Sequence, residues 1–185
     1  MQKTVKLHDL EFEPFITEEE IKNRVAEIGK SISEEFKGKN PLFIAVLNGA
    51  FVFAADLARA CPIDLEVVFI RLSSYHGLAT SGTVKTVIGL NSDIENRHLI
   101  IIEDIVDSGI TMYNFLKDLK ERKPASVSLA TLLLKPDALQ FPIKPTYVGF
   151  EIPTKFVVGY GLDFAERHRT WPFIAELKKE AYIDS

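Results

Sequence analysis

Long apolar runs define the candidate strands of this chain. Residues 42–47 and 99–102 are apolar throughout, and residues 126–134 are mainly apolar. A strand with one face in water alternates between apolar and polar residues, whereas an unbroken apolar run is typical of a parallel strand covered on both faces. Strand character also occurs in four more polar segments, at 65–72, 83–90, 147–152 and 172–177. The pattern therefore predicts a central, mainly parallel sheet.

Helical patterns lie between these strands. Thr17 and Glu20 form the T-x-x-E pattern of a capping box, and Gly38 is the expected stop of the helix. The apolar residues of this segment recur at helical spacing: Ile21, Val25, Ile28, Ile32 and Phe36. Further helices are predicted at 51–60 and 112–122, each after a strand and a loop.

Strands that alternate with helices predict an α/β fold, in which helices flank the central sheet. We expect a single domain over residues 1–185, with its core at about 40–150. The N-terminal segment and residues 151–185 are expected to form a small hood over the sheet.

The composition is that of a globular protein. Of the 185 residues, 46% are hydrophobic and 26% are charged, which excludes a disordered or fibrous chain. The formal charge of −4 argues against broad binding to nucleic acid. Cys61 is the one cysteine, so an internal disulfide is excluded. No apolar run suits a membrane span or a targeting segment, so we expect a cytoplasmic protein that binds no membrane.

The character of the chain changes abruptly after residue 102. Glu103 and Asp104 directly follow the apolar run. An unpaired carboxylate inside a core costs on the order of several kcal/mol or more. Both acids should therefore lie at the carboxyl end of the strand, facing water, a cation or ligand hydroxyls. Open α/β sheets bind their ligands at that edge.

The next segment combines hydroxyls, a glycine and free backbone N–H groups before a predicted helix: Asp107, Ser108, Gly109, Ile110 and Thr111. Helix N-termini bind anions, above all phosphate. The segment lacks the lysine of an NTPase P-loop. We therefore interpret it as a phosphate site, with Glu103 and Asp104 binding sugar hydroxyls and a hydrated Mg²⁺, which suggests a ribose 5-phosphate. The alternative is an ordinary helix start beside solvated acids.

Several motifs in matching order resemble one enzyme family. The run EDIVDSGIT at residues 103–111 is similar to the phosphoribosyl pyrophosphate (PRPP) signature of type I phosphoribosyltransferases. The resemblance covers about residues 42–169, through LNGAFVFAADLAR, IRLSSYHG and KPTYVGFEIPTKFVVGYGLD. Within the family, the chain resembles the hypoxanthine-guanine phosphoribosyltransferases. Those enzymes transfer a 5-phosphoribosyl group from PRPP to N9 of hypoxanthine or guanine in purine salvage. The resemblance also implies release of pyrophosphate, Mg²⁺ as cofactor, and a homodimer or homotetramer.

The resemblance implies roles for residues at PRPP. Glu103 and Asp104 would hold the ribose diol and the metal, residues 107–111 would bind the 5′-phosphate, and Asp107 would accept the proton at the base. Asn48 and Gly49 would cradle pyrophosphate in a loop that often contains a non-proline cis peptide. The family carries Lys or Arg where this chain has Asn48, so a charge-assisted contact is lost here. From the residues alone, this loop is equally an ordinary βα turn.

Further implied roles concern the base and the outer side of the site. Lys135 would donate to the 6-oxo group of the purine, Phe156 would stack on the ring, and the backbone of Val157 would bind its edge, with Ile105 nearby. From the residues alone, Lys135 is more simply a solvated lysine and Phe156 a core plug.

The remaining implied residues are Asp163 as a second Mg²⁺ anchor beside the purine, and Arg169 facing pyrophosphate. Ser74 and Tyr75 would close as a lid, which would keep water from an oxocarbenium-like centre.

Three alternatives stay open at this point. The first is the same chemistry with xanthine or adenine as acceptor. The second is a regulatory protein that senses PRPP and binds RNA or DNA, against which the net negative charge argues. The third is a phosphate-binding α/β domain with no nucleotide role.

Overall fold

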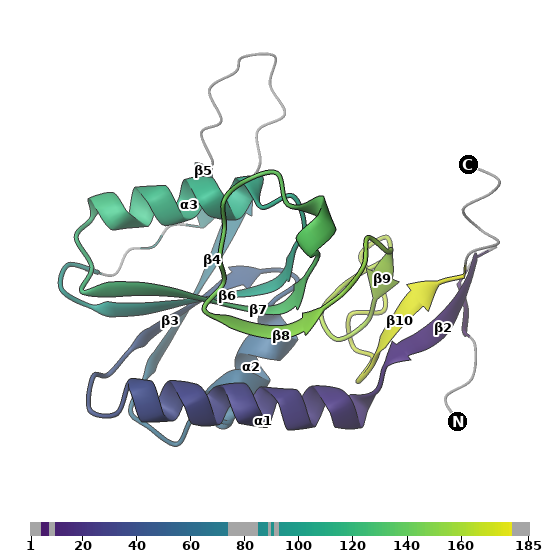
Figure 1. Cartoon of the computed structure of the whole chain (residues 1–185), viewed down its shortest axis with the longest axis horizontal. Coiled ribbons are helices and arrows are strands. Elements are labelled where there is room, and N and C mark those ends of the chain that lie inside the picture. The colour runs from purple at the N-terminus through teal and green to yellow at the C-terminus, as the bar shows by residue number, and fades with distance from the viewer. Residues whose placement is uncertain (1–4, 8–9, 74–84, 89, 91–92, 179–185) are drawn as a thin grey trace, which may run out of the picture.

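A computed structural model describes residues 5–7, 10–73, 85–88, 90 and 93–178. Within them, a six-stranded sheet has the order β5-β4-β3-β6-β7-β8 (Figure 1). The strands are β3 (Leu42–Leu47), β4 (Glu66–Ser73), β5 (Lys85–Ile88), β6 (His98–Val106), β7 (Ser126–Leu134) and β8 (Tyr147–Glu151). All neighbours in this sheet are parallel except β4 and β5, which are antiparallel. The predicted mainly parallel sheet is confirmed.

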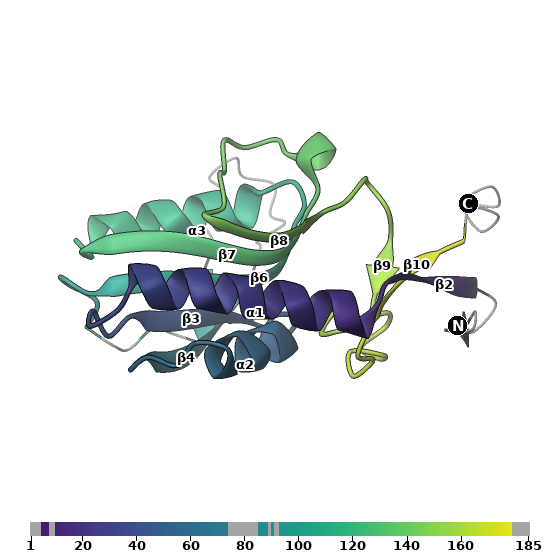
Figure 2. The ribbon, with the colours of Figure 1, turned by 60° about the horizontal axis from the view of Figure 1, so that its bottom comes forward.

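Helices cover both faces of this sheet, as Figure 2 shows. Helices α1 (Glu18–Glu35) and α2 (Phe51–Arg59) lie on one face, and α3 (Ile110–Glu121) lies on the other. Strand β6 sends alternate side chains to the two sides. Ile100 and Ile102 join the cluster formed with α1 and α2, whereas Leu99 and Ile101 join the cluster that contains residues of α3. The unbroken apolar run is thus explained by burial on both faces.

The capping box at the start of α1 is present as predicted. The Thr17 hydroxyl accepts the backbone N–H of Glu20 at 3.2 Å, and the Glu20 carboxylate accepts the backbone N–H of Thr17 at 2.8 Å. The helix ends at Glu35, with Phe36 as its C-cap. Gly38 follows with a φ of 75°, a left-handed conformation that glycine adopts without strain.

A second, antiparallel sheet forms the hood, in the order β1-β2-β10-β9. It joins β1 (Val5–Leu7) and β2 (Leu10–Ile16) from one end of the chain to β9 (Val157–Val158) and β10 (Ile174–Leu177) from the other (Figure 1). Phe12, Val158 and Ala175 make a small core of their own. A short 3₁₀ helix, Pro136–Ala138, follows β7. No helix among the described residues is long and apolar enough to cross a membrane.

The boundaries around the acidic segment differ from the prediction. Strand β6 continues to Val106, so Glu103 and Asp104 lie within the strand and not beyond its end. The reason is that β7 continues alongside, with Glu103 paired to Thr131 and Val106 to Leu134. Helix α3 begins at Ile110, two residues before the predicted start at 112. The loop between strand and helix is therefore short, which brings the acids and the helix N-terminus close together.

Candidate functional site

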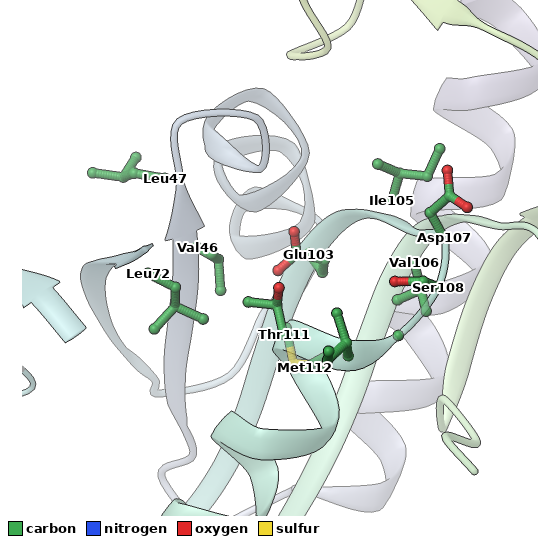
Figure 3. Close-up of a pocket in the computed structure, with 12 residues that line it drawn as sticks. Val46, Leu47, Leu72, Glu103, Ile105, Val106, Asp107, Ser108, Thr111 and Met112 are labelled. Atoms are coloured by element: carbon green, nitrogen blue, oxygen red, sulfur yellow. The ribbon is translucent and has the colours of Figure 1, made fainter. Parts of the chain in front are cut away.

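A cavity of about 280 Å³ opens where β6 ends and α3 begins. Strands β3, β4 and β6 supply Val46, Leu47, Leu72, Glu103, Ile105 and Val106, and the loop and first turn of α3 supply residues 107–112. In Figure 3, Glu103 and Thr111 lie on one side of the cavity, and Ile105 and Asp107 lie on another. The whole predicted phosphate segment therefore lines the same cavity as one of the two predicted acids.

The loop before α3 is held in a shape that leaves the helix N-terminus open. Gly109 is its N-cap with a φ of 80°, and no side chain caps the helix. A side chain at Gly109 would be strained by this φ, and its Cβ would lie 2.9 Å from Cδ1 of Ile143. The Gln140 backbone N–H donates to the Ser108 carbonyl at 3.0 Å, which fixes the loop from behind. Uncapped N–H groups beside the Ser108 and Thr111 hydroxyls suit a phosphate.

The two acids of β6 are partly buried and electrostatically linked. Burial raises the pKa of Glu103 well above its ordinary value, and the neighbouring Asp104 charge raises it further. Burial also raises the pKa of Asp104, while its hydrogen bond to Glu103 and the positive charge of Arg169 act in the opposite direction. A cation, or hydroxyl donors that replace the lost water, would stabilise the ionised form of these carboxylates.

Asp104 lies directly against the predicted pyrophosphate loop. A Cβ built on Gly49 would lie 1.7 Å from Oδ2 of Asp104, so a side chain there would displace the carboxylate. On its other side, a Cβ built on Gly161 would lie 2.0 Å from the carbonyl oxygen of Gly49. The peptide bond between Leu47 and Asn48 is cis, and the Asn48 side chain is exposed. Asn48 and Gly49 thus belong to a loop packed between a strand acid and the hood.

Arg169 lies in the loop of the hood between β9 and β10, the loop whose Gly161 approaches Gly49. Its guanidinium is 2.9 Å from Asp163 and 2.9 Å from Glu166, and it donates to the Gly161 carbonyl at 2.9 Å. Although it is engaged in these contacts, it lies close enough to Asp104 for its charge to offset part of the rise in the pKa of that residue. Sequence reasoning named Arg169 but missed Gly161, because only the approach to Gly49 shows why glycine is required there.

The predicted metal ligands are not brought together as one set. Asp163 accepts hydrogen bonds from Arg169 and from the backbone N–H of Glu166. The part of the chain that the structure describes holds no group of three or more His, Cys, Asp or Glu side chains suited to a metal ion. Glu103 and Asp104 remain as a pair of neighbouring carboxylates. Mg²⁺ is commonly held by one or two carboxylates together with water and substrate phosphates, so this donor set fits Mg²⁺ bound with substrate.

Lys135 and Asp107 form an ion pair that the sequence alone did not indicate. Nζ of Lys135 donates to Oδ2 of Asp107 at 2.7 Å, and Lys135 is only 8% exposed. The alternative of a solvated lysine is therefore wrong. Because Val106 pairs with Leu134 in the sheet, the residues that follow them are neighbours at the same edge. The contact could have been inferred from the order of the strands, since the carboxyl ends of neighbouring parallel strands lie at the same edge of the sheet.

The residues expected at the purine fall into separate places. Ile105 lines the cavity. Phe156 is 41% exposed, and its ring contacts Phe12 and Phe164 at centroid distances of 6.3 and 5.9 Å. Val157 is buried in β9, where it pairs with β10. Phe156 thus sits on the hood core with a large part of its surface open.

The predicted lid residues Ser74 and Tyr75 lie outside the described residues.

Comparison with known proteins decides the family. The family model described as "Phosphoribosyl transferase domain" matches residues 16–165. The chain belongs to the phosphoribosyltransferase family. The match includes the cavity, the loop before α3 and both β6 acids of this phosphoribosyltransferase, so the resemblance inferred from the motifs is confirmed.

Two relatives with similar sequences agree with the assignment to the phosphoribosyltransferase family. A hypoxanthine-guanine phosphoribosyltransferase of Bacillus subtilis is 44% identical over 176 residues, covering 95% of this chain and 97% of the relative. The bifunctional protein TilS/HprT of Listeria innocua is 45% identical over 170 residues, which cover 91% of this chain. The phosphoribosyltransferase chain spans about a quarter of that relative, 26% of its length.

Solved structures show the same fold. A hypoxanthine-guanine phosphoribosyltransferase from Bacillus anthracis has a TM-score of 0.85 at 40% identity, covering 90% of this chain and 98% of the other. A hypoxanthine phosphoribosyltransferase from Trypanosoma cruzi has a TM-score of 0.87 at 36% identity, covering 97% and 98%. The predicted fold class of this phosphoribosyltransferase is therefore confirmed.

Proposed function

We propose that this phosphoribosyltransferase moves a 5-phosphoribosyl group from PRPP to N9 of hypoxanthine or guanine, giving IMP or GMP and pyrophosphate. One observation carries the proposal: a carboxylate of β6 and the uncapped N-terminus of α3 line a single cavity. A phosphate next to a sugar diol needs that combination. The hypoxanthine-guanine phosphoribosyltransferase names of the relatives support the choice of purine.

The 5′-phosphate is assigned to the loop and first turn of α3. Backbone N–H groups there, with the hydroxyls of Ser108 and Thr111, supply donors without a competing side-chain cap. Glu103 is assigned to the ribose hydroxyls, because it lines the cavity beside Thr111. Acceptance of two hydroxyl donors replaces part of the hydration that the carboxylate loses by burial.

Pyrophosphate is assigned to the backbone of Asn48 and Gly49, with Arg169 as the nearby cation. Glu103 and Asp104 would hold Mg²⁺ through oxygen ligands and water. Bound there, Mg²⁺ would neutralise charge on the departing pyrophosphate as a Lewis acid. Arg169 would supply the positive charge that is absent at Asn48, since it lies close enough to Asp104 to act on that residue electrostatically.

The ion pair of Asp107 and Lys135 is assigned to the purine. Asp107 is half exposed at the cavity, where it would accept a proton from the base, at N7 or at the reacting nitrogen. The Lys135 ammonium holds Asp107 in place and would donate to a 6-oxo group. Adenine has an amino group at that position and cannot accept this hydrogen bond, so the pair favours 6-oxopurines. Phe156, Val157 and Ile105 would complete the purine side, and Asp163 acts through its pairing with Arg169.

A spectrophotometric assay with PRPP, Mg²⁺ and each purine in turn tests the proposal. We expect product with hypoxanthine and guanine, and little with adenine. Product with xanthine or with adenine, but with neither hypoxanthine nor guanine, would show that the acceptor is a different purine. Binding of PRPP without product from any purine would favour a PRPP-sensing regulator. Size-exclusion chromatography with light scattering tests the proposed homodimer or homotetramer.

A further inference from the structure

One partly buried hydrogen bond connects the hood to helix α2. The hydroxyl of Tyr160 donates to Oδ2 of Asp56 at 2.6 Å, and Tyr160 is 5% exposed. Tyr160 follows β9 in the hood, and Asp56 lies within α2 on the main domain. The two residues are 104 positions apart in the chain, so the bond joins segments that have no connection through nearby sequence.

Both ends of this bond lead to the assigned pyrophosphate loop. Helix α2 begins directly after that loop, with Ala50 as its N-cap. The residue after Tyr160 is Gly161, whose backbone lies against the Gly49 carbonyl. Gly161 also exchanges two hydrogen bonds with Arg169: its N–H donates to the Arg169 carbonyl at 2.7 Å, and its own carbonyl accepts from the guanidinium at 2.9 Å. A shift of Tyr160 would therefore move Arg169 relative to the loop.

The chemistry of the pair suits a fixed attachment. Burial raises the pKa of Tyr160 well above its ordinary value, and the hydrogen bond and charge of Asp56 raise it further. The hydroxyl therefore stays a donor throughout the physiological pH range. Arg59 binds the other oxygen of Asp56, which orients the carboxylate. The ring itself packs in the main core, so the hydroxyl can be removed without removing the packing.

We propose that Tyr160 is a positioning residue for pyrophosphate: its hydrogen bond to Asp56 fixes Gly161 and Arg169 against the Asn48–Gly49 loop. Tyr160 does not touch substrate. It sets the distance between the Arg169 guanidinium and the backbone of the Asn48–Gly49 loop. This role rests on the proposed function of that loop. Loss of the hydroxyl should weaken binding of PRPP and pyrophosphate and leave purine binding unchanged.

The test combines steady-state kinetics with calorimetric titration of pyrophosphate in Mg²⁺. For Tyr160→Phe we expect KM for PRPP and Kd for pyrophosphate to rise about tenfold, the effect of losing one hydrogen bond to a charged acceptor. KM for the purine should stay within about twofold of the wild-type value. Asp56→Ala should reproduce the effect, Asp56→Asn should retain most binding because its amide oxygen still accepts, and combining Tyr160→Phe with Asp56→Ala should add little.

Tyr147→Phe is the matched control, because Tyr147 also donates to a carboxylate, Glu35, but on α1 and β8 away from the loop. It should leave both constants unchanged. Unchanged PRPP and pyrophosphate constants in Tyr160→Phe would overturn the positioning role, as would equal effects in the control. Arg169→Met distinguishes failure of the positioning role from failure of the assigned pyrophosphate site. If it weakens pyrophosphate binding and Tyr160→Phe does not, only the positioning role is wrong; if it has no effect, the assigned pyrophosphate site is wrong as well.

Discussion

Replacement of Gly49 by Ala tests whether the close approach of Asp104 matters for activity. The new Cβ would lie 1.7 Å from Oδ2, 2.4 Å from Cγ and 3.0 Å from Oδ1 of Asp104. Ordinary contacts of a Cβ lie at 3.4–4 Å, so the carboxylate or the loop has to move by about 1.7 Å. The carboxylate cannot move freely, because it is linked to Glu103 and sits in a paired strand.

Two consequences of this displacement can be given magnitudes. Misplacement of a positioned group by about 1 Å costs about 10²-fold in rate, so kcat/KM for PRPP should fall by about that factor. Overpacking costs about 1–3 kcal/mol of unfolding free energy, which corresponds to a fall in Tm of about 2–12 °C for a domain of this size. The variant should therefore remain folded at 25 °C while losing most of its activity.

The assay varies PRPP at saturating hypoxanthine and Mg²⁺, with Tm measured on the same samples. Gly38→Ala is the matched control, since a Cβ there meets nothing within 4 Å but the φ of 75° makes it strained. It should lose about 1 kcal/mol of stability and keep its kcat/KM. If Gly49→Ala kept wild-type kcat/KM for PRPP, the contact between Gly49 and Asp104 would have no bearing on catalysis.

Three further predictions follow from the site. Asp107→Asn should lower kcat by about 10²-fold or more with a smaller change in PRPP affinity, measured under saturating substrates; an unchanged kcat would remove Asp107 as proton acceptor. Lys135→Met should reduce the ratio of kcat/KM for hypoxanthine over adenine, and an unchanged ratio would mean that Lys135 has no contact with the 6-oxo group. Because the pKa of Glu103 is raised in the folded protein, the folded state binds a proton that the unfolded chain releases above about pH 4.5. Unfolding free energy in metal-free buffer should therefore fall as pH rises from about 4.5 through the folded pKa, with a smaller slope in Glu103→Gln; equal slopes in urea titrations would contradict this.

Local patterns in the sequence were sufficient to predict the central strands and the helices that flank them, and they indicated a candidate anion site before α3. The apolar runs at 42–47 and 99–102 predicted buried parallel strands, because an interior strand has no water on either face. Thr17 and Glu20 predicted the start of α1, since a capping box depends on residues three apart. Ser108 to Thr111 predicted an anion site, because the glycine and hydroxyls act within one turn of the helix that follows.

Only the tertiary structure decided which distant residues meet. The pairing of Lys135 with Asp107 depends on the register of β6 and β7, and the approach of Gly161 to Gly49 depends on how the hood packs on the sheet edge. These contacts follow from packing between segments far apart in sequence, whereas periodicity, capping and turn formation act over a few neighbouring residues. That difference in range is why the chain alone indicated a candidate phosphate site before α3 but did not indicate the ion pair between Asp107 and Lys135.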